Sequence, residues 1–117
     1  MTDNIRIFHN PRCSKSRQTL ALIEESGVEP TVIKYLETPP TPEELRDLLA
    51  KLDMPARDLL RKGEDAYKEN NLSDPQLSDD ALIEAMVKFP KLIERPIVVK
   101  GDKAIIGRPP ERVNTLL

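Results

Sequence analysis

The only cysteine of the chain, Cys13, lies among residues that favour a reactive thiol. Its neighbours are polar or positively charged, namely Arg12, Ser14, Lys15 and Ser16. A helix is expected to begin directly after it, and the N–H groups and positive dipole end of a helix N-terminus stabilise a thiolate. We therefore predict a nucleophilic Cys13 with a lowered pKa. The alternative is a buried, unreactive cysteine, which would be expected on an apolar stripe instead.

The chain offers no second thiol that could resolve an intermediate formed on Cys13. Ser16 stands at the position where Cys-x-x-Cys oxidoreductases have their second cysteine. An external thiol must therefore complete any redox cycle that passes through a bond to Cys13. A phosphatase-type loop is also excluded, because Thr19 lies six residues after the cysteine, where that loop needs an arginine.

The only histidine, His9, lies four residues before Cys13 in the same strand-to-helix connection. It could orient the thiolate or assist it as a general acid or base, directly or through other groups. A solvated loop histidine is an equally good interpretation of the sequence alone.

A predicted β-hairpin near the C-terminus brings two arginines together. With Gly101 and Asp102 as its turn, the register places Arg95 opposite Arg108. Opposed guanidinium groups repel each other unless an anion lies between them, and two such groups form a good site for a tetrahedral oxyanion. The alternative is that both side chains extend into solvent or pair with neighbouring glutamates.

The periodicity of apolar residues predicts the elements that position these side chains. Strands are expected at residues 5–8, 31–36, 96–99 and 104–106, and longer helices from about residues 14, 41 and 78. Thr41 and Glu44 have the spacing of a capping box. The helix that they begin has an apolar stripe that is expected to be buried, namely Leu45, Leu48, Leu49 and Leu52. Residues 55–71 suggest short helices and turns, and residues 109–117 a short closing helix. The expected fold is α/β: a mixed four-stranded sheet in thioredoxin-like order, with a βαβ unit, a C-terminal hairpin and helix, and a helical insertion.

The composition limits the class of protein. A length of 117 residues with 38% apolar and 32% charged residues predicts a single soluble domain over residues 1–117. Few aromatic residues, a net charge of -2 and no basic block argue against nucleic-acid binding. We find no apolar run that could span a membrane and no signal-peptide pattern, and one cysteine excludes an internal disulfide. A reducing, cytoplasmic setting is the simplest expectation, and we expect a monomer.

Five separated segments resemble the glutaredoxin-dependent arsenate reductases. The similarity covers essentially the whole chain, and the segments occur in the family's order. They are His-Asn-Pro-x-Cys-x-x-Ser-Arg at 9–17, Tyr-Leu-Glu-Thr-Pro-Pro-Thr at 35–41, Leu-Leu-Arg-Lys at 59–62, Glu-Arg-Pro-Ile-Val-Val at 94–99 and Gly-Arg-Pro at 107–109. Ser14-Lys15 replaces the Gly-Thr of the plasmid-encoded enzyme, so the chain is more similar to a chromosomal branch of the family.

This resemblance implies a function and a set of site residues. Arsenate would be reduced to arsenite with glutathione as co-substrate and glutaredoxin as protein partner, and no metal or tightly bound cofactor would take part. Cys13 would be the nucleophile, with His9 and Ser16 beside it. Three arginines would hold the arsenic oxyanion and a cis-proline would face the site, namely Arg61, Arg95, Arg108 and Pro96.

Two other functions are compatible with the same fold. One is a transcriptional regulator that binds RNA polymerase, although its redox-sensing members have Cys-x-x-Cys where this chain has Cys13 and Ser16. The other is a thiol-transfer enzyme that acts on glutathionylated proteins. Such an enzyme needs Cys13 but no pair of oxyanion-binding arginines.

Overall fold

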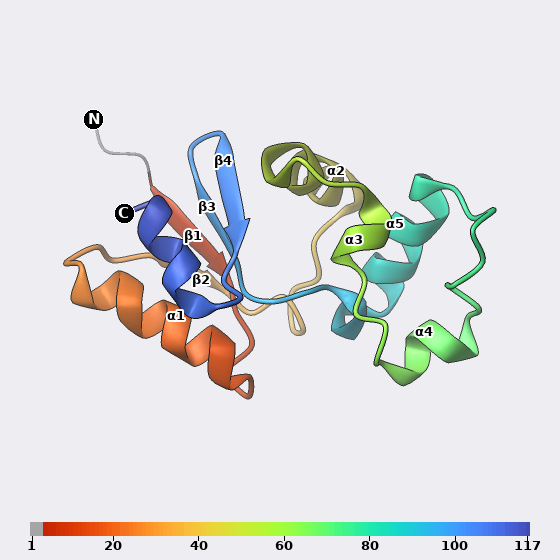
Figure 1. Cartoon of the computed structure of the whole chain (residues 1–117), viewed down its shortest axis with the longest axis horizontal. Helices are drawn as coiled ribbons and strands as arrows, with labels where there is room; N and C mark the ends of the chain where they lie inside the picture. The colour runs from red at the N-terminus through yellow and green to blue at the C-terminus, as the bar shows by residue number, and fades with distance from the viewer. Residues whose placement is uncertain (1–3) are drawn as a thin grey trace. The chain divides into compact units, whose positions relative to one another are not determined.

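The computed structural model describes residues 4–117, and Figure 1 shows their arrangement. Strands alternate with helices in the N-terminal part, several helices follow, and the chain ends in a hairpin and a short 3₁₀ helix. The elements are β1 (Ile5–Phe8), α1 (Ser14–Glu25), β2 (Thr31–Ile33), α2 (Pro42–Leu52), α3 (Ala56–Leu59), α4 (Asp65–Glu69), α5 (Asp79–Lys88), the 3₁₀ helix η1 (Pro90–Leu92), β3 (Ile97–Lys100), β4 (Lys103–Ile106) and the 3₁₀ helix η2 (Pro110–Thr115).

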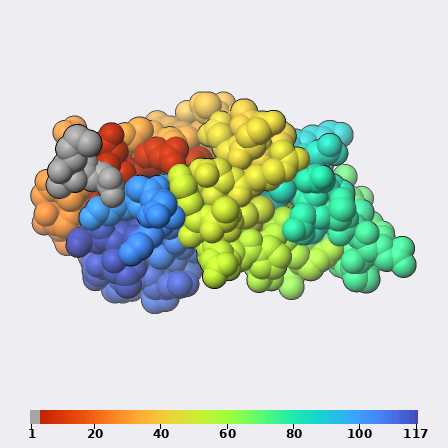
Figure 2. All heavy atoms as spheres, turned by 90° about the horizontal axis from the view of Figure 1, so that it is seen from above, coloured from red at the N-terminus to blue at the C-terminus, as the bar shows by residue number. Residues whose placement is uncertain are grey.

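The chain divides into two compact units. The first comprises the residues up to Thr38 together with Arg95–Leu117, and the second is Pro39–Glu94. Figure 2 shows the first unit's N-terminal residues (red and orange) beside its C-terminal residues (blue), although they are far apart in the sequence. The helical unit is therefore an insertion in the sequence of the sheet unit, as predicted. That residues 1–117 form a single domain stays a prediction.

The first unit is built on a four-stranded sheet with the strand order β2-β1-β3-β4. β1 pairs with β2 in parallel and with β3 antiparallel, so Ile7 lies between Val32 and Val98. The hairpin pairs Lys100 with Lys103, which confirms the predicted turn and register. The mixed sheet confirms the predicted α/β class and places the ends of β1 and β2 at one edge.

Aliphatic side chains fill the core between this sheet and its helices. α1 packs against η2 (Figure 1). Ile5 and Ile7 of β1 belong to the same buried cluster as Ile23 of α1, because alternate strand side chains point to the same face of the sheet. The buried cluster consists of Ile5, Ile7, Ile23, Val98, Val113 and Leu116. This core fixes the start of α1 relative to the end of β1, which is the connection that contains Cys13.

The second unit consists of helices whose starts follow the predicted capping signals. The Thr41 side chain accepts a hydrogen bond from the Glu44 N–H and the Glu44 side chain accepts one from the Thr41 N–H, which confirms the capping box. Ser78 caps α5 by accepting from the Ala81 N–H. α2 and α3 pack against α5, and the apolar stripe of α2 is buried at Leu45, Leu48 and Leu49.

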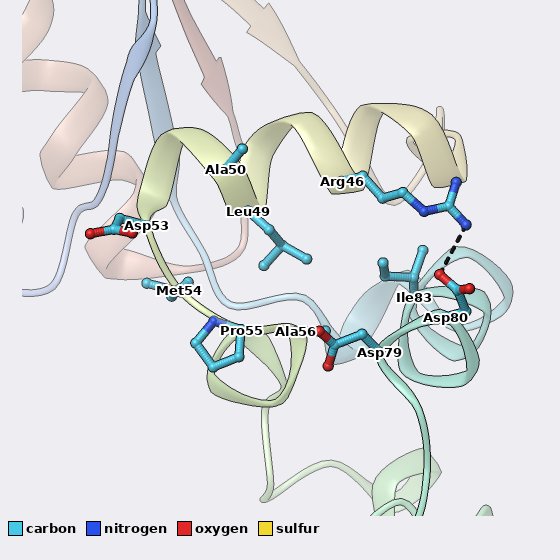
Figure 3. A pocket seen from close by; sticks show the side chains of 10 residues that line it. All are labelled: Arg46, Leu49, Ala50, Asp53, Met54, Pro55, Ala56, Asp79, Asp80 and Ile83. Atoms are coloured by element: carbon cyan, nitrogen blue, oxygen red, sulfur yellow. Dashed lines mark hydrogen bonds and ion pairs between the residues drawn. The ribbon is translucent and has the colours of Figure 1, made fainter.

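A hollow of about 520 Å³ lies between α2, α3 and the start of α5 (Figure 3). Its lining combines apolar residues such as Leu49 and Ile83 with the carboxylates of Asp53 and Asp79. At its rim Arg46 pairs with Asp80 at 3.2 Å, and both side chains are at least half exposed. An ion pair this exposed contributes little to stability.

The structure differs from the sequence prediction at three places. β2 ends at Ile33 instead of residue 36, because the Lys34 carbonyl accepts the N–H groups of Glu37 and Thr38 and turns the chain. The closing helix is a 3₁₀ helix over Pro110–Thr115. Leu52, the last apolar residue of α2, is only partly buried. Within residues 4–117 we find no helix with the length and apolar character that a membrane span requires.

Candidate active site

The connection between β1 and α1 forms a tight turn that presents Cys13. The Cys13 N–H donates to the Asn10 carbonyl at 3.0 Å, and the Arg12 N–H donates to the Asn10 side chain at 3.0 Å. Arg17, one turn into the helix, donates from its guanidinium to the Pro11 carbonyl at 2.9 Å. Cys13 itself is the N-cap residue of α1 in an extended conformation. The thiol is therefore held at the helix N-terminus.

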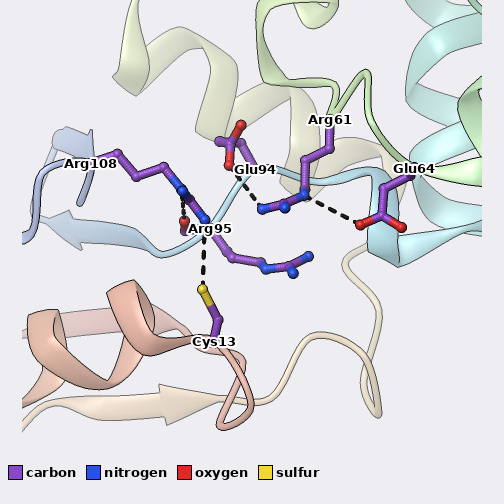
Figure 4. Close-up of polar contacts among 6 residues, drawn as sticks. All are labelled: Cys13, Arg61, Glu64, Glu94, Arg95 and Arg108. Carbon is purple, nitrogen blue, oxygen red and sulfur yellow. Dashed lines mark hydrogen bonds and ion pairs between the residues drawn. The ribbon is translucent and has the colours of Figure 1, made fainter.

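The Cys13 thiol is partly exposed and receives several hydrogen bonds. Burial raises its pKa, but the backbone N–H groups of Ser16 and Lys15 and the side chain of Arg95 lower it more. A guanidinium nitrogen of Arg108 lies 3.6 Å from the sulfur (Figure 4). The pKa of Cys13 is lower than that of an ordinary thiol as a result, in the direction predicted from the sequence.

The hairpin brings Arg95 and Arg108 to the same sulfur. The Arg108 Nε donates to the Arg95 carbonyl at 2.7 Å (Figure 4). The Gly107 N–H donates to the Pro96 carbonyl at 2.9 Å, which extends the pairing of the hairpin beyond its strands. The predicted juxtaposition of the two arginines is thus present. The Arg95–Pro96 bond is cis, as the resemblance implied, and so is Arg108–Pro109, which no sequence pattern indicated.

Tyr35 is a site residue that no sequence pattern singled out as functional. It follows β2, is fully buried, and interacts with the guanidinium of Arg95. Burial lowers the pKa of Arg95, but its electrostatic interactions and hydrogen bonds with Tyr35 and Cys13 raise this pKa above its ordinary value. The contact with Tyr35 therefore helps to hold the Arg95 guanidinium in place beside the thiol. Its sequence signals were its place near the end of the strand predicted at 31–36 and at the start of the family-like segment at 35–41, and neither indicated a contact with Arg95.

His9 is buried, so the interpretation as a solvated loop histidine is wrong. Its Nδ1 lies 2.6 Å from the Ser16 hydroxyl, which accepts the Asn10 N–H at 3.0 Å. Burial, and to a lesser extent the charges of Lys34 and Arg17, lower the pKa of His9 and keep it neutral. Ser16 also donates its own N–H to the sulfur, so two hydrogen bonds connect His9 to Cys13 through Ser16.

Arg61 belongs to the helical unit. Its Nη1 pairs with Glu94 at 3.2 Å and its Nε with Glu64 at 3.5 Å (Figure 4). Its backbone N–H donates to the Leu92 carbonyl at 2.7 Å, which fixes the start of its side chain. A role of Arg61 in oxyanion binding stays a prediction.

The rate at which iodoacetamide alkylates Cys13 should reach half its maximum at a lower pH than it does for a free thiol. For a free thiol this pH equals the thiol pKa of about 8.5. Only the thiolate reacts, so a lowered pKa moves the rate profile towards acid. The same chain unfolded in denaturant is the control, since its thiol has lost the hydrogen bonds. Coinciding profiles for folded and unfolded protein would contradict the thiolate assignment.

Gly107 connects β4 to Arg108 and tolerates no side chain. A Cβ at this position would lie 2.6 Å from the Thr19 Oγ1 and 2.9 Å from the Pro96 ring. We expect Gly107→Ala to lower the free energy of unfolding by about 1–3 kcal/mol in a urea titration, because the buried neighbours must move. Gly63→Ala is the matched control, since nothing lies within 4 Å of its Cβ. Equal stability of both variants would contradict the close packing at Gly107.

A comparison with models of protein families shows which family the chain belongs to. The model of the ArsC family matches residues 8–116. The chain belongs to the ArsC family. Among ArsC-related sequences, the uncharacterized protein YfgD of Escherichia coli is 62% identical over 97% of this chain and 96% of its own. An arsenate reductase of Neisseria meningitidis serogroup A is 50% identical over 97% of each chain.

A solved structure shows the same architecture for a related ArsC protein. The arsenate reductase from Vibrio cholerae superposes with a TM-score of 0.96 at 55% identity, and the match covers 100% of both chains. This likeness confirms the thioredoxin-like fold expected from the sequence. In the part of the chain from residue 4 onwards, no group of three or more His, Cys, Asp or Glu side chains could hold a metal ion.

Proposed function

We propose that this ArsC-family protein is an arsenate reductase that uses Cys13 as its nucleophile. The observation that supports this most directly is the convergence of Arg95 and Arg108 on the Cys13 thiol. A thiolate beside two guanidinium groups suits a reaction in which sulfur attacks the central atom of a bound oxyanion. The names of several ArsC relatives agree with this chemistry.

The first proposed step joins arsenate to Cys13. Arg95 and Arg108 bind oxygens of the monoanion, and the N–H groups at the start of α1 contribute to the same anion site. The sulfur forms a bond to arsenic while one arsenic–oxygen bond breaks. The departing hydroxyl group takes up one proton and leaves as water. This proton balances the one that the Cys13 thiol released when it became a thiolate. Arsenic stays pentavalent, and the guanidinium groups stabilise the charge that develops on its oxygens.

The second step is the reduction, and glutathione is the proposed reductant. Its sulfur attacks the Cys13 sulfur, so that a disulfide forms and the electron pair of the sulfur–arsenic bond passes to arsenic. Arsenic leaves as trivalent arsenite, which takes up the proton of the glutathione thiol. Glutaredoxin then attacks the glutathione sulfur, forms its own mixed disulfide and releases the Cys13 thiolate. External thiols supply all the electrons, in keeping with Cys13 as the single cysteine.

His9, Ser16 and Arg61 complete the proposal. His9 positions the Cys13 loop through its hydrogen bond to Ser16, and its burial keeps it neutral. Arg61 is proposed as a third arginine for the oxyanion, on the resemblance alone. Its two glutamate partners would hold its guanidinium in a defined orientation.

The test is arsenite formation in the presence of glutathione, glutaredoxin, glutathione reductase and NADPH. Oxidation of NADPH follows the coupled reaction, and arsenite is measured directly so that other oxidations do not count. We expect sustained arsenite formation only when glutathione and glutaredoxin are both present, and without glutaredoxin at most about one arsenite per protein molecule, because the mixed disulfide on Cys13 is not resolved. Folded wild-type protein that forms no arsenite would overturn the proposal. Removal of glutathione from a glutathionylated protein by the same sample would then favour thiol transfer.

A further inference from the structure

A groove of about 270 Å³ lies beside the active-site loop of the first unit. β1 and β2 are parallel, and the paired residues Phe8 and Ile33 end both strands at the same edge of the sheet. The loops that follow these two strands form the groove. Small ligands of open α/β sheets bind at such carboxyl ends of parallel strands. The lining residues are His9, Asn10, Pro11, Arg12, Lys34, Leu36 and Glu37.

The two walls of this groove are fixed by hydrogen bonds. The His9 N–H donates to the Ile33 carbonyl at 2.8 Å, which joins the two loops at their starts. The second loop is closed by bonds from the Glu37 and Thr38 N–H groups to the Lys34 carbonyl, both at 2.9 Å. His9 and Asn10 are buried and form a polar part of the lining. The groove is therefore formed before a ligand binds, which lowers the entropic cost of binding.

The charges along the groove match a short peptide with both signs of charge. Arg12 and Lys34 are exposed cations from the two different loops, and Glu37 is an exposed carboxylate. Leu36, exposed to 36%, and Pro11 add apolar surface between them. A ligand with two carboxylates, one ammonium group and a short uncharged middle would be complementary to this arrangement.

We propose that this groove binds the thiol co-substrate glutathione, an inference that rests on the proposed function. Arg12 and Lys34 bind its two carboxylates, and Glu37 binds the ammonium of its γ-glutamyl residue. An extended tripeptide spans about 10 Å and the thiol of glutathione belongs to its middle residue, so a ligand anchored at Arg12 has its thiol within reach of the adjacent residue, Cys13. The volume of the groove is at the small end of the range for ligand pockets. Such a volume suits a tripeptide that is only partly buried and that binds weakly and dissociates quickly.

The first experiment measures binding with S-methylglutathione, which cannot react with Cys13. It is titrated into the wild-type chain, and the backbone amide signals of Asn10, Arg12 and residues 34–37 are followed by NMR. We expect saturable shifts in both loops, and a dissociation constant that rises about five- to tenfold in Lys34→Glu. Lys103→Glu is the matched control, because this exposed lysine lies at the hairpin turn, beside the opposite end of β1. Shifts absent from both loops, or equal weakening by both variants, would overturn the proposal.

A second experiment tests the role of Glu37. N-acetyl-S-methylglutathione lacks the ammonium group and should bind the wild-type chain more weakly than S-methylglutathione does. Glu37→Gln should weaken S-methylglutathione about threefold but leave the affinity for the acetylated ligand unchanged. Equal weakening of both ligands would contradict the contact between Glu37 and the ammonium group.

The two proposals fail in distinguishable ways. Arsenite formation with glutathione, combined with no shifts in the two loops, would overturn the groove and leave the arsenate reductase proposal standing. Saturable shifts in both loops without arsenite formation would support a glutathione site in this groove on a protein with another reaction. Turnover adds a third measurement: Lys34→Glu should raise the KM for glutathione by the factor seen in binding, with the KM for arsenate unchanged.

Discussion

Cys13→Ser is expected to reduce arsenite formation at least about 10³-fold, to the level measured without enzyme. The lowered pKa increases the fraction of Cys13 that is thiolate, whereas a serine hydroxyl in the same place stays protonated and is a poor nucleophile. The hydroxyl also cannot form the disulfide that the second step requires. The coupled assay with direct arsenite detection measures this loss.

The variant is informative because the fold does not depend on this side chain. Cys13 is partly exposed, and its replacement by an oxygen of similar size opens no large cavity. We expect an unchanged circular dichroism spectrum and a melting temperature within a few degrees of the wild type. Ser14→Ala, a change at an exposed neighbouring position, is the matched control and should keep its activity. Wild-type turnover by folded Cys13→Ser would refute the nucleophile assignment.

Omitting glutaredoxin provides a second observation on the same residue. The wild-type chain should then accumulate with one glutathione attached, because the mixed disulfide on Cys13 has no partner thiol to resolve it. Mass spectrometry after incubation with arsenate and glutathione detects the added mass. Cys13→Ser should remain unmodified under these conditions. An unmodified wild-type chain that still turns over would contradict the proposed order of the two thiols.

The positions of the reactive groups could be predicted from the sequence where local rules determine them. Cys13 precedes a helix because apolar periodicity begins after it, and a helix N-terminus favours a thiolate whatever the rest of the fold. The hairpin register follows from the two turn residues, and that register alone predicts that Arg95 lies near Arg108. In both cases, the relevant residues are close in sequence or joined by one turn.

The contacts that the sequence did not predict are those between separate elements. Tyr35 interacts with Arg95, which is far away in the sequence, because β2 ends early and the chain turns at Lys34. The burial of His9 and its bond to Ser16 depend on how the loop folds over the first turn of α1. No periodicity or propensity describes such contacts, since they arise from tertiary packing.

Arg95→Ala and Arg108→Ala are each expected to lower kcat/KM for arsenate about 10²- to 10³-fold. Each guanidinium contacts the Cys13 sulfur in the free protein and would stabilise the charge on the arsenate oxygens during attack. Lysine at either position should restore part of the loss, since it returns the charge without the planar pair of donors. Steady-state kinetics at saturating glutathione measures both effects. Arg112→Ala, an exposed arginine of the same unit, is the control and should be unaffected.

The alkylation profile separates two ways in which these arginines could act. Arg95→Ala removes a contact that lowers the Cys13 pKa, so the pKa should rise and less thiolate should be present at neutral pH. If that were the whole effect, activity would recover at a pH above the new pKa. If Arg95 and Arg108 bind one oxyanion together, the loss persists at high pH, and the double variant loses less than the product of the two single losses. Recovery of full activity at high pH would show that the arginines serve the thiolate alone, and the oxyanion site would then be elsewhere.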